Sequence, residues 1–100
     1  MRAVKVEYTV SPAYVNTNKA NIEKVMTELH GLGDVGILYS TYIKEDGLSF
    51  VHFSIHKTEE NILTSLPSFK TFTEQLKAEG LSGEAPKAVK LEMVAKSFDF

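Results

Sequence analysis

The chain has 100 residues, a length that normally corresponds to one domain around one hydrophobic core. Hydrophobic residues make up 43% of it and charged residues 24%, which is ordinary for a globular protein. The formal net charge is −2, and acidic and basic residues are interspersed, so the basic stripe of a nucleic-acid-binding protein is missing. We therefore expect a single domain over residues 1–100 that does not bind nucleic acid.

The sequence also excludes several kinds of chemistry. Cysteine is absent, which removes disulfides, thiolate nucleophiles and cysteine-ligated metal or iron–sulfur sites. We find no phosphate-binding loop and no nucleophile elbow. There is no signal-peptide core and no apolar run of about 20 residues that could span a membrane. We therefore expect a cytoplasmic protein that binds neither a membrane nor a cofactor.

The first third of the chain predicts a strand and then a helix. Apolar and polar residues alternate at the start, which is typical of a half-buried strand, and Pro12 ends the pattern. The apolar members of this strand are Val4, Val6, Tyr8 and Val10. Residues 16–18 offer N-cap candidates for the helix, and Gly31 predicts its end. Its single apolar stripe comprises Ile22, Val25, Met26 and Leu29.

Two strands joined by a tight hairpin come next. Residues 35–44 predict the second strand and residues 48–56 the third, with the turn pair Asp46-Gly47 between them. These two strands are therefore antiparallel neighbours. The third strand has large apolar residues on both of its faces, which is typical of a strand that is covered on both sides.

The last part of the chain predicts an interrupted helix and a final strand. Residues 58–61 have the composition of a helix start, and Pro67 breaks the region into a short turn and a longer helix that ends at Gly80. Residues 82–86 form a loop, and apolar alternation from Val89 to Ala95 predicts the fourth strand. The resulting order, β-α-β-β-α-β, predicts an α+β ferredoxin-like sandwich. Strands one and three lie at the centre of an antiparallel four-stranded sheet, and both helices cover one face.

The sheet face without helices is the second feature that the order predicts. We expect four charged residues there, namely Lys5, Glu7, Lys90 and Glu92. Strands two and three add large apolar groups to that face, whichever of their sides meets the helices. If the alternate residues 51, 53 and 55 lie under the helices, then Leu48 and Phe50 lie outside. An apolar patch of this kind, several hundred Å² in area, is typical of an interface, so we predict a homodimer through the sheet face.

These features resemble the dimeric α+β barrel superfamily, and within it the antibiotic-biosynthesis-monooxygenase-like domains. The resemblance is carried by the order of elements, by the Asp46-Gly47 hairpin into an aromatic strand, and by the break and helix over residues 66–72. It covers almost the whole chain. It implies a homodimer whose two sheets form a barrel, with a small cavity between sheet and helices in each subunit.

Members of that superfamily include cofactor-independent oxygenases that act on polyaromatic quinols, and enzymes that degrade haem. The haem-degrading branch relies on an Asn in the first strand, a Trp and a His. The first strand here has no Asn and the chain has no Trp, so the resemblance does not carry haem chemistry over.

Two histidines of the third strand are the candidate titratable groups. His52 and His56 point to the same side, and their attachment points are about 13 Å apart at the usual rise per residue. Two ligands of one zinc ion lie within about 4 Å of each other, so this spacing argues against a shared metal ion within one chain. Each histidine has either a structural or interface role, or a role as a ligand or in proton transfer. His30, at the end of the first helix, complements the helix dipole.

We carry two hypotheses for the function. In the first, the chain is a monooxygenase-like enzyme, with His52 as the base for a phenolic substrate and Tyr39 as the residue that orients it. The other ligand-binding candidates are Phe50, His56, Phe69 and Phe72. In the second, it is a homodimeric binding or assembly module whose cavity is packed shut. An open cavity of about 300 Å³ or more, with a histidine projecting into it, favours the enzyme, whereas filling by Phe69, Phe72 and Met26 favours the module.

Overall fold

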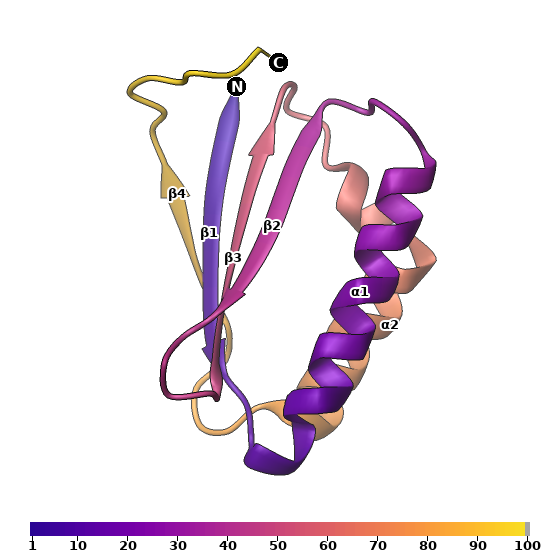
Figure 1. Cartoon of the computed structure of the whole chain (residues 1–100), viewed down its shortest axis with the longest axis vertical. Coiled ribbons are helices and arrows are strands. Elements are labelled where there is room, and N and C mark those ends of the chain that lie inside the picture. Colours follow the sequence, from indigo (N-terminus) through magenta and orange to yellow (C-terminus); the bar gives the residue numbers. More distant parts are fainter. Residues whose placement is uncertain (100) are drawn as a thin grey trace.

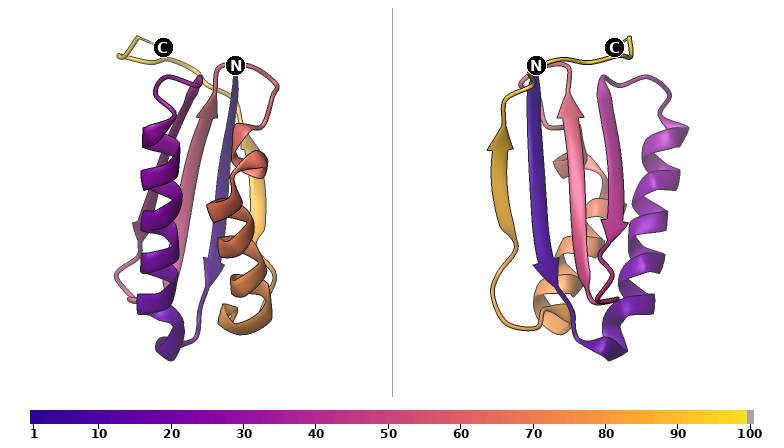
Figure 2. Two further views of the ribbon diagram at one scale, coloured as in Figure 1. Left: turned by 90° about the vertical axis from the view of Figure 1, so that its right-hand side faces the viewer. Right: turned by 60° about the vertical axis from the view of Figure 1, so that its left-hand side comes forward.

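The computed structural model describes residues 1–99 and shows one antiparallel sheet with both helices on one face (Figures 1 and 2). The sheet order is β2-β3-β1-β4, which confirms the predicted ferredoxin-like α+β fold with the first and third strands at the centre. The strands are β1 (Arg2–Thr9), β2 (Ile37–Ile43), β3 (Ser49–His56) and β4 (Lys87–Leu91). The helices are α1 (Val15–Gly31) and α2 (Pro67–Gln75). Three short turns, η1 (Pro12–Tyr14), η2 (Ile62–Ser65) and the π-helical η3 (Leu76–Gly80), flank them.

The register of β3 decides which of its side chains meet the helices. The imidazole of His52 lies with its ring centroid 5.5 Å from that of Phe72 in α2, so the even-numbered residues of β3 face the helices. Val51 and Phe53 therefore face away from them. The arrangement with residues 51, 53 and 55 under the helices is thus wrong, and Phe50 is a core residue with only 2% of its surface exposed. Both faces of β3 are apolar, so the strand's own pattern could not distinguish them.

Pairing with β3 places the neighbouring strands on the same two faces. Val6 and Thr41 both pair with His52, and Tyr8 pairs with Phe50, so these side chains also lie on the helix side. The core between the layers is closed by α1 and α2. Its buried apolar members are Tyr8, Val10, Tyr14, Ile22, Val25, Leu29, Phe50, Leu63, Leu66, Phe72 and Leu76.

The helix ends differ from the predicted ones by a few residues. Pro12 starts the turn η1, which runs directly into α1, so Tyr14 occupies the N-cap position and the predicted caps at 16–18 lie inside the helix. At the other end, Gly31 is still helical and Leu32 is the C-cap. The left-handed backbone conformation that favours glycine occurs two residues later, at Gly33, where φ is 75°.

The break at Pro67 is confirmed. Asn61 caps η2, because its side-chain oxygen accepts a hydrogen bond from the Leu63 amide at 3.2 Å. Pro67 then occupies the first turn of α2, where its missing N–H costs no helical hydrogen bond. Among residues 1–99, no helix has both the length and the apolar sequence needed to cross a membrane.

The fourth strand is shorter than predicted, and its two faces are exchanged relative to the prediction. It ends at Leu91, and Lys90 pairs with Val4, so Lys90 lies on the helix side and not on the open face. Val89 and Leu91 face outward instead, both about 40% exposed. Every residue of β4 is exposed. The helices therefore do not cover β4, and its apolar residues gain no burial by facing the helix side. Lys5 and Glu7 lie on the open face as predicted, and they form an ion pair.

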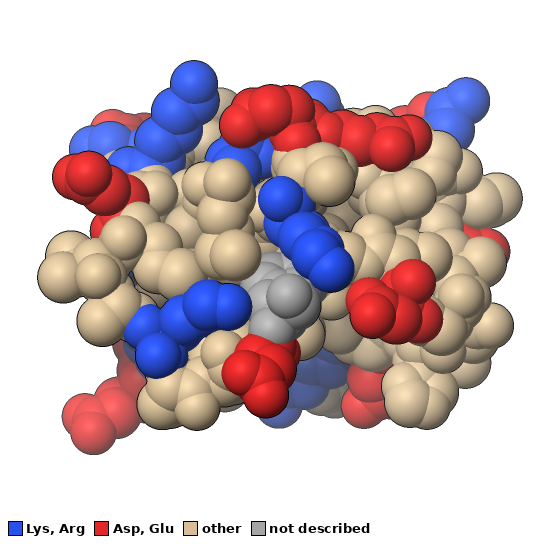
Figure 3. All heavy atoms as spheres, turned by 90° about the horizontal axis from the view of Figure 1, so that it is seen from above, with Lys and Arg blue, Asp and Glu red and all other residues tan. Residues whose placement is uncertain are grey.

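Charge is distributed without a dominant sign. At the end of the molecule where both termini lie, Lys, Arg, Asp and Glu side chains are interspersed over the visible face (Figure 3). This agrees with the mixed pattern of the sequence.

Candidate functional site

A small, partly open cavity lies between the sheet and α2, with a volume of about 120 Å³. The sheet contributes Val6, Tyr8, Tyr39, His52 and Ser54 to its wall. The helical segments contribute Leu63, Phe69, Phe72, Thr73 and Leu76, and the loop before β4 contributes Pro86. The lining is almost entirely apolar, so the few polar atoms that reach it determine what it can recognise.

His52 provides the polar end of this cavity, and both of its ring nitrogens are engaged. Its Nε2 lies 2.7 Å from the hydroxyl of Tyr8, and its Nδ1 lies 2.6 Å from the hydroxyl of Tyr39. Thr41 lies beside the second contact, with its hydroxyl 3.1 Å from Nδ1. The amide of Asn18, from α1, donates to the Tyr8 hydroxyl at 2.9 Å. The network therefore joins the helix layer to three strands.

Burial keeps this network uncharged. It lowers the pKa of His52 to about 4, because water no longer stabilises the imidazolium. It raises the pKa values of the Tyr8 and Tyr39 hydroxyls, because the phenolate ions would be desolvated. A neutral imidazole has one N–H donor and one acceptor nitrogen, so His52 donates to one of its tyrosine partners and accepts from the other.

Aromatic rings form one wall around the imidazole. The Tyr39 and His52 rings stack with centroids 5.8 Å apart, and Phe69 and Phe72 lie 5.8 Å apart on α2. Such faces suit a flat, apolar ligand. Four of the predicted site residues, His52, Tyr39, Phe69 and Phe72, are therefore brought together.

The other two predicted ligand-binding residues lie elsewhere. Phe50 stacks on the far side of Tyr8, with centroids 5.8 Å apart and planes inclined by 15°, and does not line the cavity. His56 is buried near Arg2, and its Nε2 lies 3.1 Å from the Ser54 hydroxyl. Burial, and next the nearby Arg2 guanidinium, lower the pKa of His56.

The sequence patterns did not identify Asn18 or Thr41 as members of the network. Asn18 is completely buried, and it precedes Ile22 by four residues, which places it on the apolar stripe of α1. A polar residue in line with such a stripe is the signal that could have revealed it. Predicting that Thr41 belongs to the network requires the register of β2 on β3, because only its pairing with His52 brings the two side chains together.

The cavity is smaller than the roughly 300 Å³ expected for the enzyme hypothesis. Its volume of about 120 Å³ is below 300 Å³, and Phe69 and Phe72 occupy part of the space as the second hypothesis requires. Met26 does not contribute to the wall. A cavity of roughly 150 Å³ can admit a benzene molecule, so the space is suited to about one aromatic ring.

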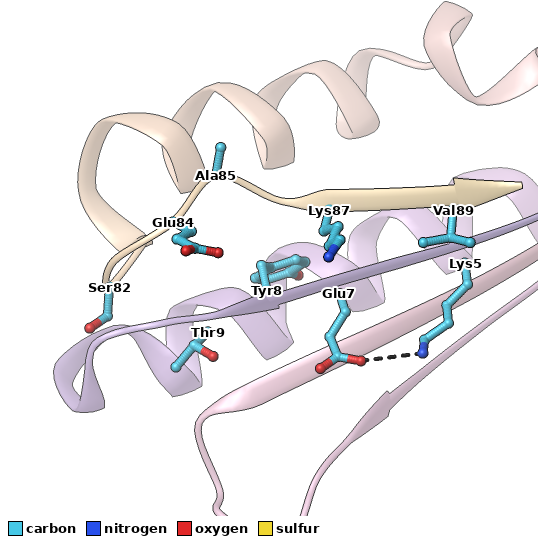
Figure 4. Close-up of a pocket in the computed structure, with 9 residues that line it drawn as sticks. All are labelled: Lys5, Glu7, Tyr8, Thr9, Ser82, Glu84, Ala85, Lys87 and Val89. Carbon is cyan, nitrogen blue, oxygen red and sulfur yellow. Dashed lines mark ion pairs between the residues drawn. The ribbon is translucent and has the colours of Figure 1, made fainter.

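Two more open hollows border this cavity. One, of about 540 Å³, lies at the sheet edge between β1 and the 82–86 loop, and charged side chains surround it (Figure 4). Those charged residues are Lys5, Glu7, Glu84 and Lys87. The other, of about 640 Å³, lies between α1 and β2. Tyr8 lines both the first hollow and the cavity, and Tyr39 lines both the second hollow and the cavity.

The fold is similar to that of solved antibiotic biosynthesis monooxygenases, which confirms the predicted resemblance at the level of the fold. A crystal structure of an antibiotic biosynthesis monooxygenase superimposes with a TM-score of 0.78 at 12% sequence identity, covering 95% of this chain and 100% of the other. The protein Rv0793 from Mycobacterium tuberculosis superimposes with a TM-score of 0.76 at 17% identity, covering 97% and 98%.

A third similar structure is a variant of SnoaB, a cofactor-independent oxygenase from Streptomyces nogalater. Its TM-score is 0.70 at 11% identity, and the match covers 98% of this chain and 97% of that one. No protein-family profile matches the chain, and no curated protein sequence matches it. At these identities the similarity establishes the fold and leaves the reaction to be argued from the site.

Proposed function

We propose that this chain binds a small phenolic or quinol molecule in the cavity and oxidises it with dioxygen, as a cofactor-independent monooxygenase. The observation that carries the proposal is His52, a neutral imidazole at the polar end of an otherwise apolar, aromatic-walled cavity. A flat ring fills the apolar part, and its oxygen meets the Tyr39–His52 pair. The similarity of fold to SnoaB supports the same class of reaction.

Tyr39 connects the ligand to His52 in this mechanism, because both imidazole nitrogens already contact hydroxyl groups. The substrate hydroxyl donates its proton to the Tyr39 oxygen, and Tyr39 passes its own proton to Nδ1. The products of this step are a substrate phenolate and a His52 imidazolium. The adjacent phenolate offsets part of the cost of charging a buried imidazole.

The phenolate then supplies the electrons for oxygen. Electron density reaches the ring carbon para to the phenolate oxygen, which forms a bond to dioxygen. Loss of water from the resulting peroxide leaves a carbonyl. For a phenol with hydrogen at that carbon, the His52 imidazolium returns its proton to the peroxide, and the balance is C₆H₆O plus O₂ to C₆H₄O₂ plus H₂O. The substrate supplies all four electrons, so the reaction requires neither metal nor flavin.

Oxygen consumption with single-ring phenols that carry hydrogen at the para carbon tests this proposal. We expect turnover by the wild type and at least a tenfold loss in His52→Ala and in Tyr39→Phe, in line with the usual contribution of a general base. Tyr14→Phe is the matched control, since Tyr14 is buried but does not line the cavity. Equal rates in the wild type and His52→Ala would remove His52 from the mechanism.

The small cavity favours a second candidate function, a binding or assembly module without catalysis. In that case His52 is a structural group that fastens β1, β2 and β3 together through Tyr8 and Tyr39. Absence of oxygen consumption with every substrate, together with a loss of folding stability in His52→Ala, would support this alternative.

We also propose that the chain forms a homodimer through the open sheet face. The outward side chains of β3 are Ser49, Val51, Phe53 and Ile55, whereas its helix side carries two histidines and Ser54 in addition to Phe50. The side turned away from the helices is thus the more apolar one. Outward-facing neighbours extend this surface, namely Leu38, Tyr42, Val89 and Leu91, and each of them is about 40% exposed or more.

A further inference from the structure

We propose that the groove between α1 and β2 binds an apolar extension of the ligand whose ring occupies the cavity, and that Tyr39 is the movable wall between the two. The inference rests on the proposed binding of a phenolic ring in the cavity. It specifies the ligand class as a phenol or quinol that carries an alkyl chain or a further ring. The apolar wall of the groove comprises Met26, Leu29, Val35, Ile37, Leu38 and Tyr39. Thr27, His30 and Gly33 complete its lining, and below it is called the α1–β2 groove.

The proposal begins from a mismatch in size. The cavity of about 120 Å³ suits one ring, whereas the adjoining α1–β2 groove measures about 640 Å³. Tyr39 lines both of them. Displacement of this one side chain would therefore join the cavity, with His52 in its wall, to the larger groove.

Tyr39 is held less firmly than Tyr8, the residue shared by the cavity and the charged hollow beside β1. Tyr8 lies in a central strand, is 5% exposed, bonds both Asn18 and His52, and stacks on Phe50. Tyr39 lies in the edge strand β2 and is only partly buried. Its hydroxyl has His52 and Thr41 as partners, its ring stacks on His52, and within residues 1–99 no group from the helices bonds it as Asn18 bonds Tyr8. The wall toward the α1–β2 groove is thus the one that can open.

His52 keeps a hydrogen bond when Tyr39 moves. Its Nδ1 lies 3.1 Å from the Thr41 hydroxyl. The hydroxyl of an extended ligand takes the place of the Tyr39 hydroxyl at Nδ1, so that His52 receives the ligand's proton directly and not through Tyr39. A buried imidazole nitrogen left without a partner would cost about 1–3 kcal/mol. Thr41 removes most of that cost, so only a small part of the ligand's binding free energy is needed to rotate the Tyr39 side chain.

The chemistry of the two hollows decides which one receives the extension. The hollow at the sheet edge is surrounded by two lysines and two glutamates, whose hydration would be lost against an apolar group (Figure 4). The α1–β2 groove is mostly apolar, and burial of further ligand carbon there is favourable. The ligand therefore extends past Tyr39 and not past Tyr8.

Calorimetric titration with phenol and with 4-pentylphenol tests this inference. Both probes carry the same ring and hydroxyl, and only the second has a chain for the groove. Each fully buried methylene is worth about fourfold in affinity, so a partly covered pentyl chain should tighten binding by at least tenfold. Equal affinities would overturn the groove while leaving the cavity site intact. Failure of both probes to bind would reject the proposed function itself.

A pair of tryptophan variants tests where the pentyl chain of 4-pentylphenol binds. Thr27 is exposed and lines the groove, so Thr27→Trp should fill it and remove the advantage of 4-pentylphenol without weakening phenol. Ala20→Trp is the matched control, because Ala20 is exposed on the same side of α1, two turns away from Thr27, and does not line the groove. An unchanged advantage in a folded Thr27→Trp protein would contradict the assignment.

A measurement on the unmodified protein makes the test independent of that variant. Amide chemical shifts of residues 26–30 and 35–39 should respond to 4-pentylphenol and much less to phenol. Shifts of the same size with both probes would also overturn the inference.

Discussion

At the scale of single residues, the consequence of burying His52 is a dependence of folding on pH. The imidazole is 4% exposed, and both of its nitrogens meet neutral hydroxyl groups, so the folded state holds it uncharged. In the unfolded chain the same group has its ordinary pKa near 6.5. The unfolded state therefore takes up a proton at a higher pH than the folded state does.

The resulting prediction concerns stability between neutral and acidic pH. The folded pKa of His52 is about 4, so stability is complete above pH 6.5 and falls as the pH is lowered through that value. At pH 5 the loss should reach about 2 kcal/mol, measured by urea unfolding at pH 7.5 and at pH 5. His52→Gln should reduce this loss. The same pH dependence in the variant would assign the effect to other groups, such as His56, whose pKa is also lowered.

At the scale of secondary-structure elements, the β2–β3 hairpin depends on one side chain. The Asp46 carboxylate accepts hydrogen bonds from the Leu48 and Ser49 amides, both at 2.8 Å, and from the Ser49 hydroxyl at 2.6 Å. Led by the Ser49 hydroxyl, these donors lower the pKa of the Asp46 carboxyl. Gly47 supplies the positive φ of 71° that completes the turn.

Asp46→Ala should therefore destabilise the fold by about 1 kcal/mol, which is typical for the loss of a capping side chain. Thermal unfolding measures the effect. Glu45→Ala is the matched control, because Glu45 is an exposed acidic neighbour in the same turn. An equal effect in both variants would indicate that charge, and not the hydrogen bonds to Leu48 and Ser49, stabilises the turn.

The packing of η3 on η1 gives a second prediction at this scale. A Cβ atom at Gly80 would lie well inside van der Waals contact with the ring of Tyr14, which is itself buried. Gly80→Ala should cost about 1–3 kcal/mol, as is usual for overpacking. Gly31→Ala should be neutral or stabilising, since nothing lies within 4 Å of its added Cβ and alanine favours a helix. Equal melting temperatures for the two variants would contradict this packing argument.

The elements could be predicted from the sequence because local patterns determine them. Period-two alternation located β1, and Pro67 and Asp46-Gly47 marked the break and the hairpin. The orientation of β3 could not be predicted, since Phe50 and Phe53 are equally apolar and lie on opposite faces. The site could be predicted only in part, because the contact between Asn18 and Tyr8 joins a helix to a strand and depends on tertiary packing.

At the scale of the whole molecule, the proposed dimer depends on the open sheet face. The helices cover one face, and Figure 2 shows the strands uncovered on the other side. Phe53 and Tyr42 pack edge to face there with ring centroids 6.0 Å apart, yet Tyr42 is 56% exposed. Partners in a stable interface each bury about 800 Å², and a two-fold axis through this face would place such a surface against its own copy.

Sedimentation at micromolar concentration should accordingly show a dimer. Phe53→Lys should convert it to a monomer, because two buried lysines close to the two-fold axis would lose their hydration and repel each other. Leu32→Lys is the matched control, since Leu32 is 50% exposed at the end of α1, away from the open face. A monomeric wild type would contradict the dimer. The wall of the cavity comes from a single chain, so the monomeric Phe53→Lys variant should still bind phenol. Loss of phenol binding on dissociation would show that the site needs both subunits.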